Sequence, residues 1–160
     1  NFLNLFFISL CMYEELSKGY DELYGAEQLK KIEIIKPYLK GKILDLGAGT
    51  GILAKHFPNV TSLEPCKEML DQAPEPKVLA KAEEIPFEDN SFDTIVSLTA
   101  LHHCDIDKVI SEIKRLNPKH LALTLLKKSK NCKSFTKKLH ENFKLKEIDE
   151  GKDLIFIQIN

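Results

Sequence analysis

The sequence predicts a single α/β domain built on a doubly wound, mostly parallel sheet of seven strands with helices on both faces. Short apolar runs alternate with helical patterns along residues 43–126, which is typical of a parallel sheet covered on both sides. Only Glu150-Gly151-Lys152 separates the last two runs, which predicts a C-terminal antiparallel hairpin. The 160 residues, 43% apolar and 29% charged, suit one globular domain with one core.

Seven segments are predicted to be strands from their apolar and β-branched content and from the turn residues between them. They are residues 43–46, 60–63, 77–80, 92–98, 120–126, 143–148 and 154–159. The run at 92–98 is apolar enough to be buried on both faces of the sheet.

Helices are predicted from apolar residues spaced three and four positions apart. They cover residues 16–24, 26–36, 52–57, 67–72, 106–116 and 132–139. Gly25 is predicted to separate the first two helices, and the second is predicted to bury Leu29, Ile32 and Ile35. Asp105 is predicted to cap the helix at 106–116.

Residues 1–12 are predicted to lie outside the domain, which is expected to span residues 13–160. The apolar stretch 1–11 is too short to cross a bilayer as a helix and lacks the basic leader of a signal peptide. It is expected to be upstream sequence, a vector remnant or the result of a misplaced start codon. The alternative is an apolar arm that covers the substrate pocket or a partner.

The net charge of −1 predicts no overall attraction to nucleic acid or to a membrane. Lysines are nevertheless concentrated between residues 127 and 146, which is expected to be a solvated face, with attraction of an anionic substrate or RNA as the alternative. The four scattered cysteines form no Cys-x-x-Cys pair, so no metal site is expected and a reducing, cytoplasmic compartment is favoured.

The stretch Asp45-Leu46-Gly47-Ala48-Gly49-Thr50-Gly51 predicts a strand end, a tight turn and a helix start. Such a turn lets a ligand approach the backbone closely at the carboxyl end of a parallel strand. Glu64 ends the next strand, where a carboxylate can accept both ribose hydroxyls of an adenosine. Asp45 would repel a pyrophosphate and attract a sulfonium or an ammonium, so a cofactor with a cationic end is favoured.

Four stretches together resemble the class I S-adenosylmethionine-dependent methyltransferases, and in particular their type 11 group. These stretches are residues 45–51, 62–70, 82–93 and 95–103, and the similarity covers about residues 13–125. The resemblance implies a Rossmann-like fold of three layers (α/β/α), with S-adenosyl-L-methionine as cofactor and S-adenosyl-L-homocysteine as product. It also implies a small-molecule or tRNA acceptor and allows for a small activator subunit. DNA is not expected as a substrate.

The resemblance also implies a cofactor-binding role for individual residues. Those expected near the methionine end and the methyl donor are Asp45, Gly47, Ala48, Gly49, Gly51, Ser97 and Leu98. Those expected at the ribose and adenine are Glu64, Pro65, Met69, Ala82 and Glu83. Glu83 is included because the family often has an acid where this chain has Lys81, and an ammonium cannot accept a hydrogen bond from the adenine amino group.

The acceptor side is expected to include Tyr20, His102 and His103. His102 is the candidate general base, because a histidine can take a proton from an acceptor near neutral pH. Such a base is needed only if the acceptor loses a proton, since alignment and exclusion of water supply most of the rate of methyl transfer.

Two other functions stay open. One is an NAD(P)-binding oxidoreductase, against which the glycine spacing and the missing catalytic Tyr/Lys pair argue. The other is a catalytically inactive subunit that binds S-adenosylmethionine, which Lys81 and the lack of a clear acceptor site keep open. The sequence does not identify the acceptor atom.

Overall fold

The computed structural model describes residues 19–159, and at residues 20, 21 and 23 the backbone alone. The predicted extension 1–12 therefore lies outside the described residues. The first described helix, α2 (Tyr20–Ile35), ends in a 3₁₀ turn, η1 (Lys36–Tyr38), which leads into the sheet. Pro37 fits this turn because it cannot continue the hydrogen-bond pattern of the helix.

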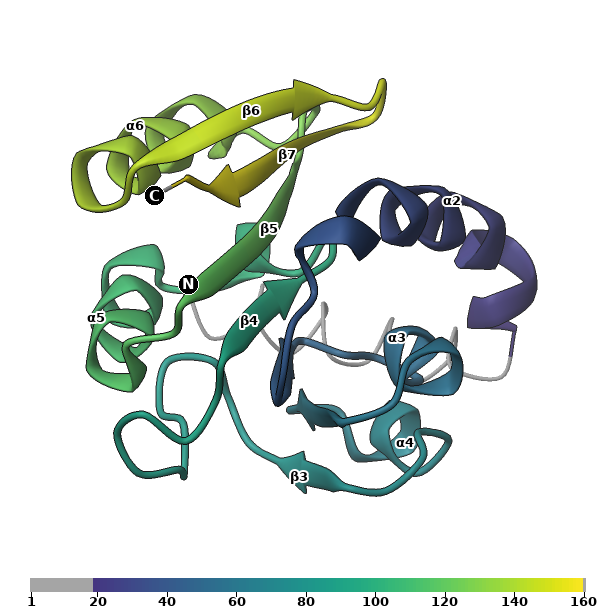
Figure 1. The fold of residues 1–160 in the computed structure, drawn as a ribbon. Helices are drawn as coiled ribbons and strands as arrows, with labels where there is room; N and C mark the ends of the chain where they lie inside the picture. The colour runs from purple at the N-terminus through teal and green to yellow at the C-terminus, as the bar shows by residue number, and fades with distance from the viewer. Residues whose placement is uncertain (1–18, 160) are drawn as a thin grey trace, which may run out of the picture.

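Seven strands form one sheet in the order β3-β2-β1-β4-β5-β7-β6 (Figure 1). Their bounds are β1 (Ile43–Leu46), β2 (Val60–Glu64), β3 (Lys77–Leu79), β4 (Thr94–Ser97), β5 (His120–Leu126), β6 (Leu145–Asp149) and β7 (Asp153–Gln158). Neighbouring strands are parallel except that β7 runs antiparallel to both β5 and β6. The predicted Rossmann-like sheet with a C-terminal hairpin is confirmed.

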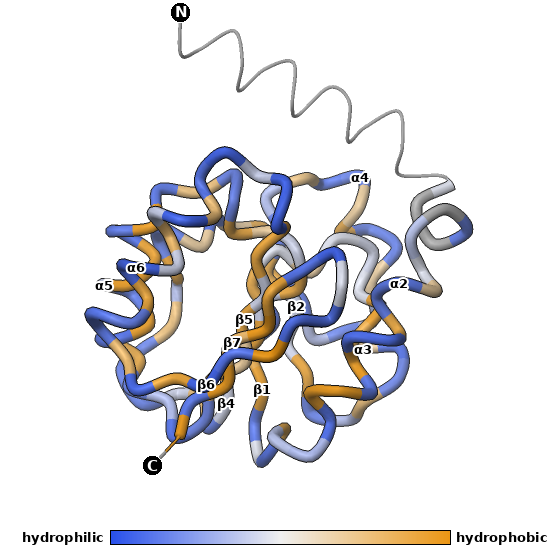
Figure 2. Tube along the Cα trace, turned by 90° about the horizontal axis from the view of Figure 1, so that it is seen from above, coloured by the Kyte–Doolittle hydropathy of each residue, from blue (hydrophilic) through white to orange (hydrophobic). Residues whose placement is uncertain are grey.

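Helices cover both faces of this sheet (Figure 1). On one face α2 and α3 (Ile52–His56) pack against the strands, and on the other face α5 (Ile106–Leu116) and α6 (Cys132–Asn142) do so. Two short elements follow strands directly, namely α4 (Lys67–Leu70) after β2 and η2 (Leu101–His103) after β4. Viewed from above, hydrophobic residues gather in the central strands and hydrophilic ones on the outside (Figure 2).

The structure corrects two predictions for the first helical region. The predicted break at Gly25 is wrong, because α2 runs through this residue. A glycine inside a helix costs only about 1 kcal/mol relative to alanine, which packing can offset. The predicted buried face is also wrong at Leu29, which is 38% exposed, whereas Gln28 and Lys31 are buried beside Ile32.

The order of the strands reverses between β1 and β4, and at such a point a crevice opens beyond the carboxyl ends of the strands. Ser97 joins the two strands there, because its hydroxyl donates a hydrogen bond to the carbonyl oxygen of Leu46 at 2.8 Å. Gly47 follows β1 and Leu98 follows β4, so the sheet brings both residues to the crevice. No helix within residues 19–159 has the length and apolarity needed to cross a membrane.

Asp105 caps α5, as predicted, because its Oδ1 accepts hydrogen bonds from the backbone N–H groups of Asp107 and Lys108 at 3.2 and 3.4 Å. We expect Asp105→Ala to lower the free energy of unfolding by about 1 kcal/mol. Asp105→Ser should lose much less, because a serine hydroxyl also caps a helix. Urea denaturation of both variants measures the difference, and equal losses would contradict a capping role.

Candidate functional site

A small cavity lies at the carboxyl ends of β1 and β4, where α2 and the start of α3 approach them. It is lined by Gln28, Asp45, Gly47, Ala48, Gly49, Ile52, Leu53 and Leu98. Its volume of about 30 Å³ is room for a water molecule or a group of ammonium size. The sequence predicts Asp45, Leu98 and the three turn residues 47–49 as parts of a binding site, and the structure brings them together here.

The turn after β1 depends on its glycines. Gly47, Gly49 and Gly51 have φ angles of 69°, 58° and 78°, which residues with a side chain rarely adopt. A Cβ on Gly47 would lie 2.4 Å from the Cβ of Ala100, and one on Gly51 would lie 2.6 Å from the Cβ of Ala73. Gly51 therefore serves the turn and the start of α3, and it does not line the cavity.

The Glu64 carboxylate joins the end of β2 to this turn. Its Oε2 accepts a hydrogen bond from the backbone N–H of Gly49, and its Oε1 accepts one from that of Cys66, both at 2.9 Å. Burial raises the pKa of Glu64, while these two hydrogen bonds act in the opposite direction. A carboxylate has about four acceptor positions, so two remain for the donors of a ligand.

Two buried acceptors in the cavity have no hydrogen-bond partner in the described part of the chain. They are Oδ1 of Asp45, a residue 2% exposed, and Oε1 of Gln28, a residue 7% exposed. Burial, reinforced by the nearby Glu64, raises the pKa of Asp45 to about 8. An unsatisfied buried acceptor costs about 1–3 kcal/mol, so the cavity favours a ligand group that donates hydrogen bonds and is positively charged.

Sequence reasoning missed three residues that line the cavity: Gln28, Ile52 and Leu53. The two apolar residues open α3, directly after the glycine turn, so their position beside the ligand follows from the predicted turn. Gln28 carried no comparable signal, because its approach to β1 depends on how α2 packs on the sheet.

The residues predicted at the adenine lie outside the cavity. Pro65 is exposed, whereas Met69 and Ala82 are 2% and 5% exposed. The loop after Ala82 is held by α5, since Glu112 accepts a hydrogen bond from the N–H of Ile85 at 2.7 Å and Arg115 donates one to its carbonyl oxygen at 2.9 Å. Their roles toward a nucleoside stay predictions.

Glu83 is engaged within the protein, because its Oε1 accepts a hydrogen bond from the backbone N–H of Asp105 at 2.9 Å. The carboxylate thus connects the loop after β3 to the start of α5. Lys81 is exposed. Ser97, predicted beside the methyl donor, directs its hydroxyl to Leu46 in the sheet.

His102 and His103 lie in η2, with ring centroids 3.9 Å apart. Burial, followed by repulsion from His103, lowers the pKa of His102 to about 4, and Asp153 acts in the opposite direction. Burial also lowers the pKa of His103. Both rings are therefore neutral at pH 7, and neither lines the cavity. Tyr20 opens α2, but its side chain lies outside the described residues.

No group of three His, Cys, Asp or Glu side chains in residues 19–159 is arranged to hold a metal ion. The described cysteines, Cys66, Cys104 and Cys132, are not in disulfide bonds. Burial raises the pKa of the Cys104 thiol to about 12, so this thiol is neutral.

Comparisons with known proteins agree with the sheet and the glycine turn. Residues 44–119 match the family model described as a methyltransferase domain. An uncharacterized protein of Methanocaldococcus jannaschii is 35% identical over 113 residues, which are 65% of this chain and 45% of that protein. An uncharacterized methyltransferase of Mycobacterium tuberculosis is 32% identical over 122 residues, which are 66% of this chain and 50% of that protein. The chain thus spans about half the length of the curated relatives it matches.

Solved structures share the fold over more of the chain. A SAM-dependent methyltransferase of Thermotoga maritima, described as a possible histamine N-methyltransferase, has a TM-score of 0.73 at 18% identity, covering 91% of this chain and 96% of that one. Magnesium protoporphyrin IX methyltransferase from Synechocystis, solved with SAM bound, has a TM-score of 0.58 at 16% identity, covering 82% and 76%. At these identities the likeness concerns the fold.

Asp45 makes the stability of the ligand-free protein dependent on pH. Its pKa rises from 3.8 to about 8 on folding, so between these values the folded state holds a proton that the unfolded state has lost. Stability from this group therefore falls as pH rises from about 4 to about 8. Asp45→Asn should raise Tm at pH 8 by at least about 3 °C, equivalent to about 1 kcal/mol for a domain of this size, and change it little at pH 4. A Tm difference independent of pH in calorimetric scans would refute the raised pKa.

Proposed function

Because residues 44–119 form the core of a class I S-adenosylmethionine-dependent methyltransferase domain, we propose that this chain transfers a methyl group from that cofactor to a small-molecule acceptor. S-adenosylmethionine supplies a methyl group carried on a positively charged sulfur. The observation that carries the proposal is the cavity beside the glycine turn, where Asp45 and Gln28 present buried acceptors without partners among the described residues.

The residues of this cavity fit the amino-acid end of the cofactor. An ammonium group is positively charged and has three donors, so it has enough donors for both Oδ1 of Asp45 and Oε1 of Gln28. It also favours the ionised form of Asp45, which burial alone opposes. The cavity volume of about 30 Å³ suits this group, and the nucleoside is assigned to the residues outside it.

Glu64 is proposed to hold the ribose. The N–H groups of Gly49 and Cys66 fix its carboxylate, and its remaining acceptor positions suit two hydroxyl donors. Asp45, when ionised, disfavours a pyrophosphate near the glycine turn, which argues against an NAD(P)-dependent oxidoreductase. A carboxylate that holds a ribose, such as Glu64, suits either cofactor.

His102 is proposed to act toward the acceptor as a neutral hydrogen-bond acceptor or base. Its Nδ1 is buried without a partner in the described residues, and its lowered pKa keeps the ring neutral at pH 7. A histidine with a pKa of about 4 is a weak base, so it suits an acceptor whose proton leaves easily.

A small molecule is favoured over tRNA because three lysines of the lysine-rich segment are engaged in ion pairs within the protein. Lys127 pairs with Asp149, Lys137 with Glu141 and Lys138 with Asp107. Each pairing reduces the positive charge available for a phosphate backbone. A tRNA base remains the alternative acceptor, and a small activator subunit the proposed source of any missing part of the acceptor pocket.

Calorimetric titration with S-adenosylhomocysteine and with NADH tests the cofactor. We expect binding of S-adenosylhomocysteine alone, reduced at least about tenfold by Glu64→Gln, because an amide NH₂ cannot accept from the N–H of Gly49 or Cys66. Glu68→Gln is the matched control, since Glu68 is an exposed carboxylate four residues away. Preferential binding of NADH would overturn the proposal.

Transfer of a labelled methyl group to cell extract, separated into small-molecule, RNA and protein fractions, tests the reaction. Label is expected in small molecules with the wild-type protein and is expected to disappear with Glu64→Gln. If His102 accepts the proton, His102→Asn should slow transfer about 100-fold without weakening cofactor binding. Label in RNA would support the tRNA alternative. Cofactor binding without transfer to any fraction would support an inactive subunit.

A further inference from the structure

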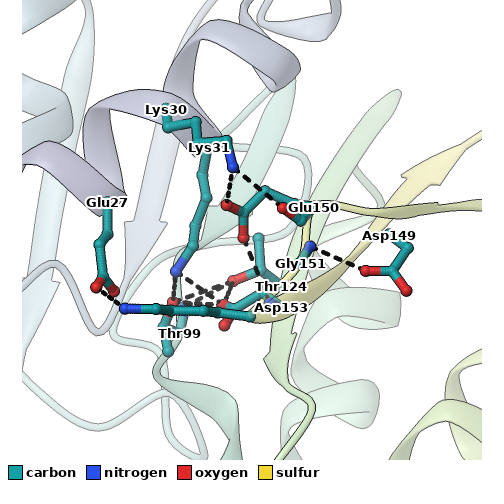
Figure 3. Close-up of polar contacts among 10 residues, drawn as sticks. Glu27, Lys30, Lys31, Thr99, Thr124, Asp149, Glu150, Gly151 and Asp153 are labelled. Carbon is teal, nitrogen blue, oxygen red and sulfur yellow. Dashed lines mark hydrogen bonds and ion pairs between the residues drawn. The ribbon is translucent and has the colours of Figure 1, made fainter.

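Among the described residues, three ion pairs join α2 to the turn between β6 and β7 and to the first residue of β7 (Figure 3). Glu27 pairs with Lys152, Lys30 with Glu150 at 3.0 Å, and Lys31 with Asp153 at 3.0 Å. The first two pairs use lysines that are each 64% exposed. The third is different in kind, because the side chains of Lys31 and Asp153 are 2% and 0% exposed.

Two threonines hydrogen-bond to the buried pair, while Oδ1 of Asp153 has no partner among the described residues. Lys31 Nζ donates a hydrogen bond to Oγ1 of Thr99 at 2.7 Å, and Thr99 Oγ1 donates one to Oδ2 of Asp153 at 2.6 Å. Thr124 Oγ1 donates to the same carboxylate oxygen at 2.9 Å and accepts from the backbone N–H of Thr99 at 2.7 Å. Figure 3 shows these four side chains converging between α2, β5 and β7.

Thr99 has a φ angle of 54°, in the left-handed region. A β-branched residue rarely adopts this conformation, which costs about 1–3 kcal/mol and persists only where the surroundings impose it. Here the backbone N–H and the hydroxyl of Thr99 are both held by the buried cluster. The network therefore fixes the turn that follows β4.

The same network reaches both walls of the cofactor cavity. Leu98, which lines the cavity, immediately precedes Thr99 in the chain. Gln28, which lines it from α2, lies one helical turn before Lys31. A single buried cluster thus connects the wall supplied by α2 to the wall supplied by the turn after β4.

We propose that Lys31, Thr99 and Asp153 are positioning residues for the amino-acid end of the cofactor. By fixing α2 against the turn after β4, they hold Gln28 and Leu98 at the distance that encloses this end beside Asp45. The inference rests on the proposed function, because it takes S-adenosylmethionine as the ligand of the cavity.

Stability alone is a poor explanation for the cluster. Burying a lysine and an aspartate carries a desolvation penalty that often cancels their attraction, and apolar residues of similar size can be equally stabilising. The two more exposed pairs already join the same helix to the same turn. The buried pair additionally fixes the backbone conformation of Thr99, the residue after Leu98 of the cavity wall.

The double variant Lys31→Met/Asp153→Asn tests the inference, because it removes both charges and leaves neither buried alone. Its affinities for S-adenosylhomocysteine and for 5′-methylthioadenosine, which lacks the amino-acid end, are measured by calorimetry below its melting temperature. We expect at least about fivefold weaker binding of S-adenosylhomocysteine, through lost pre-organisation, and 5′-methylthioadenosine binding within twofold of wild type. Lys152→Gln, which breaks the more exposed ion pair between the β6–β7 turn and Glu27 of α2, should change neither affinity.

If the double variant does not fold, two single variants at Thr99 test the positioning role. Thr99→Ser keeps the hydroxyl and should retain wild-type affinity for S-adenosylhomocysteine. Thr99→Val keeps the branched shape, loses the hydroxyl and should bind at least about fivefold more weakly. Rescue by serine is the result that a purely steric role for Thr99 would not produce.

The outcomes separate this inference from the function on which it rests. If the wild-type protein does not bind S-adenosylhomocysteine, the proposed function fails. If the wild type binds it and the folded variants bind it equally well or more tightly, the positioning role is wrong and the function stands. Equal weakening for both nucleosides would also overturn the positioning role, because it would show a general loss of structure.

Discussion

Two carboxylates buried side by side at the ends of β1 and β2 impose the main electrostatic constraint on this molecule. Asp45 and Glu64 each raise the free energy of the ligand-free state, since burial and mutual repulsion both oppose ionisation of Asp45. Two backbone N–H groups compensate Glu64, whereas Oδ1 of Asp45 has no hydrogen-bond partner among residues 19–159. A donor that carries positive charge would satisfy the free acceptor of Asp45 and would favour its ionised form.

Helix α2 contributes a polar wall to the cavity at the expense of its own amphipathic pattern. The face that it turns to the sheet carries Gln28, Lys31, Ile32 and Ile35, at spacings of three and four residues. A polar residue at the cavity and a charged one at the buried ion pair occupy positions where a purely structural helix would carry apolar residues. The helix thereby acts as one wall of the site as well as a cover for the sheet.

The strands, the hairpin and the glycine turn could be predicted because each depends on a local pattern, such as the apolar run of β4 or the glycines at 47, 49 and 51. The buried face of α2 could not, because the rule that polar residues face solvent fails where a site needs them inside. The prediction at Gly25 failed for a related reason, since tertiary packing outweighed a weak local preference. Gln28 was missed because only the folded chain brings it to Asp45.

The conformation of the cavity wall after β1 could be predicted from the sequence, whereas that of the wall after β4 could not. The residues that fix the two walls show why. Gly47 and Thr99 both have left-handed backbone conformations, one and two residues after the ends of the neighbouring strands β1 and β4. Glycine itself permits the left-handed conformation, so the conformation at Gly47 could be predicted from the sequence. At Thr99 the conformation is imposed by Lys31, Thr124 and Asp153, which lie 68, 25 and 54 positions away in the chain. The wall after β4 therefore depends on partners that only the fold brings together, whereas the wall after β1 depends on the glycines of its own turn.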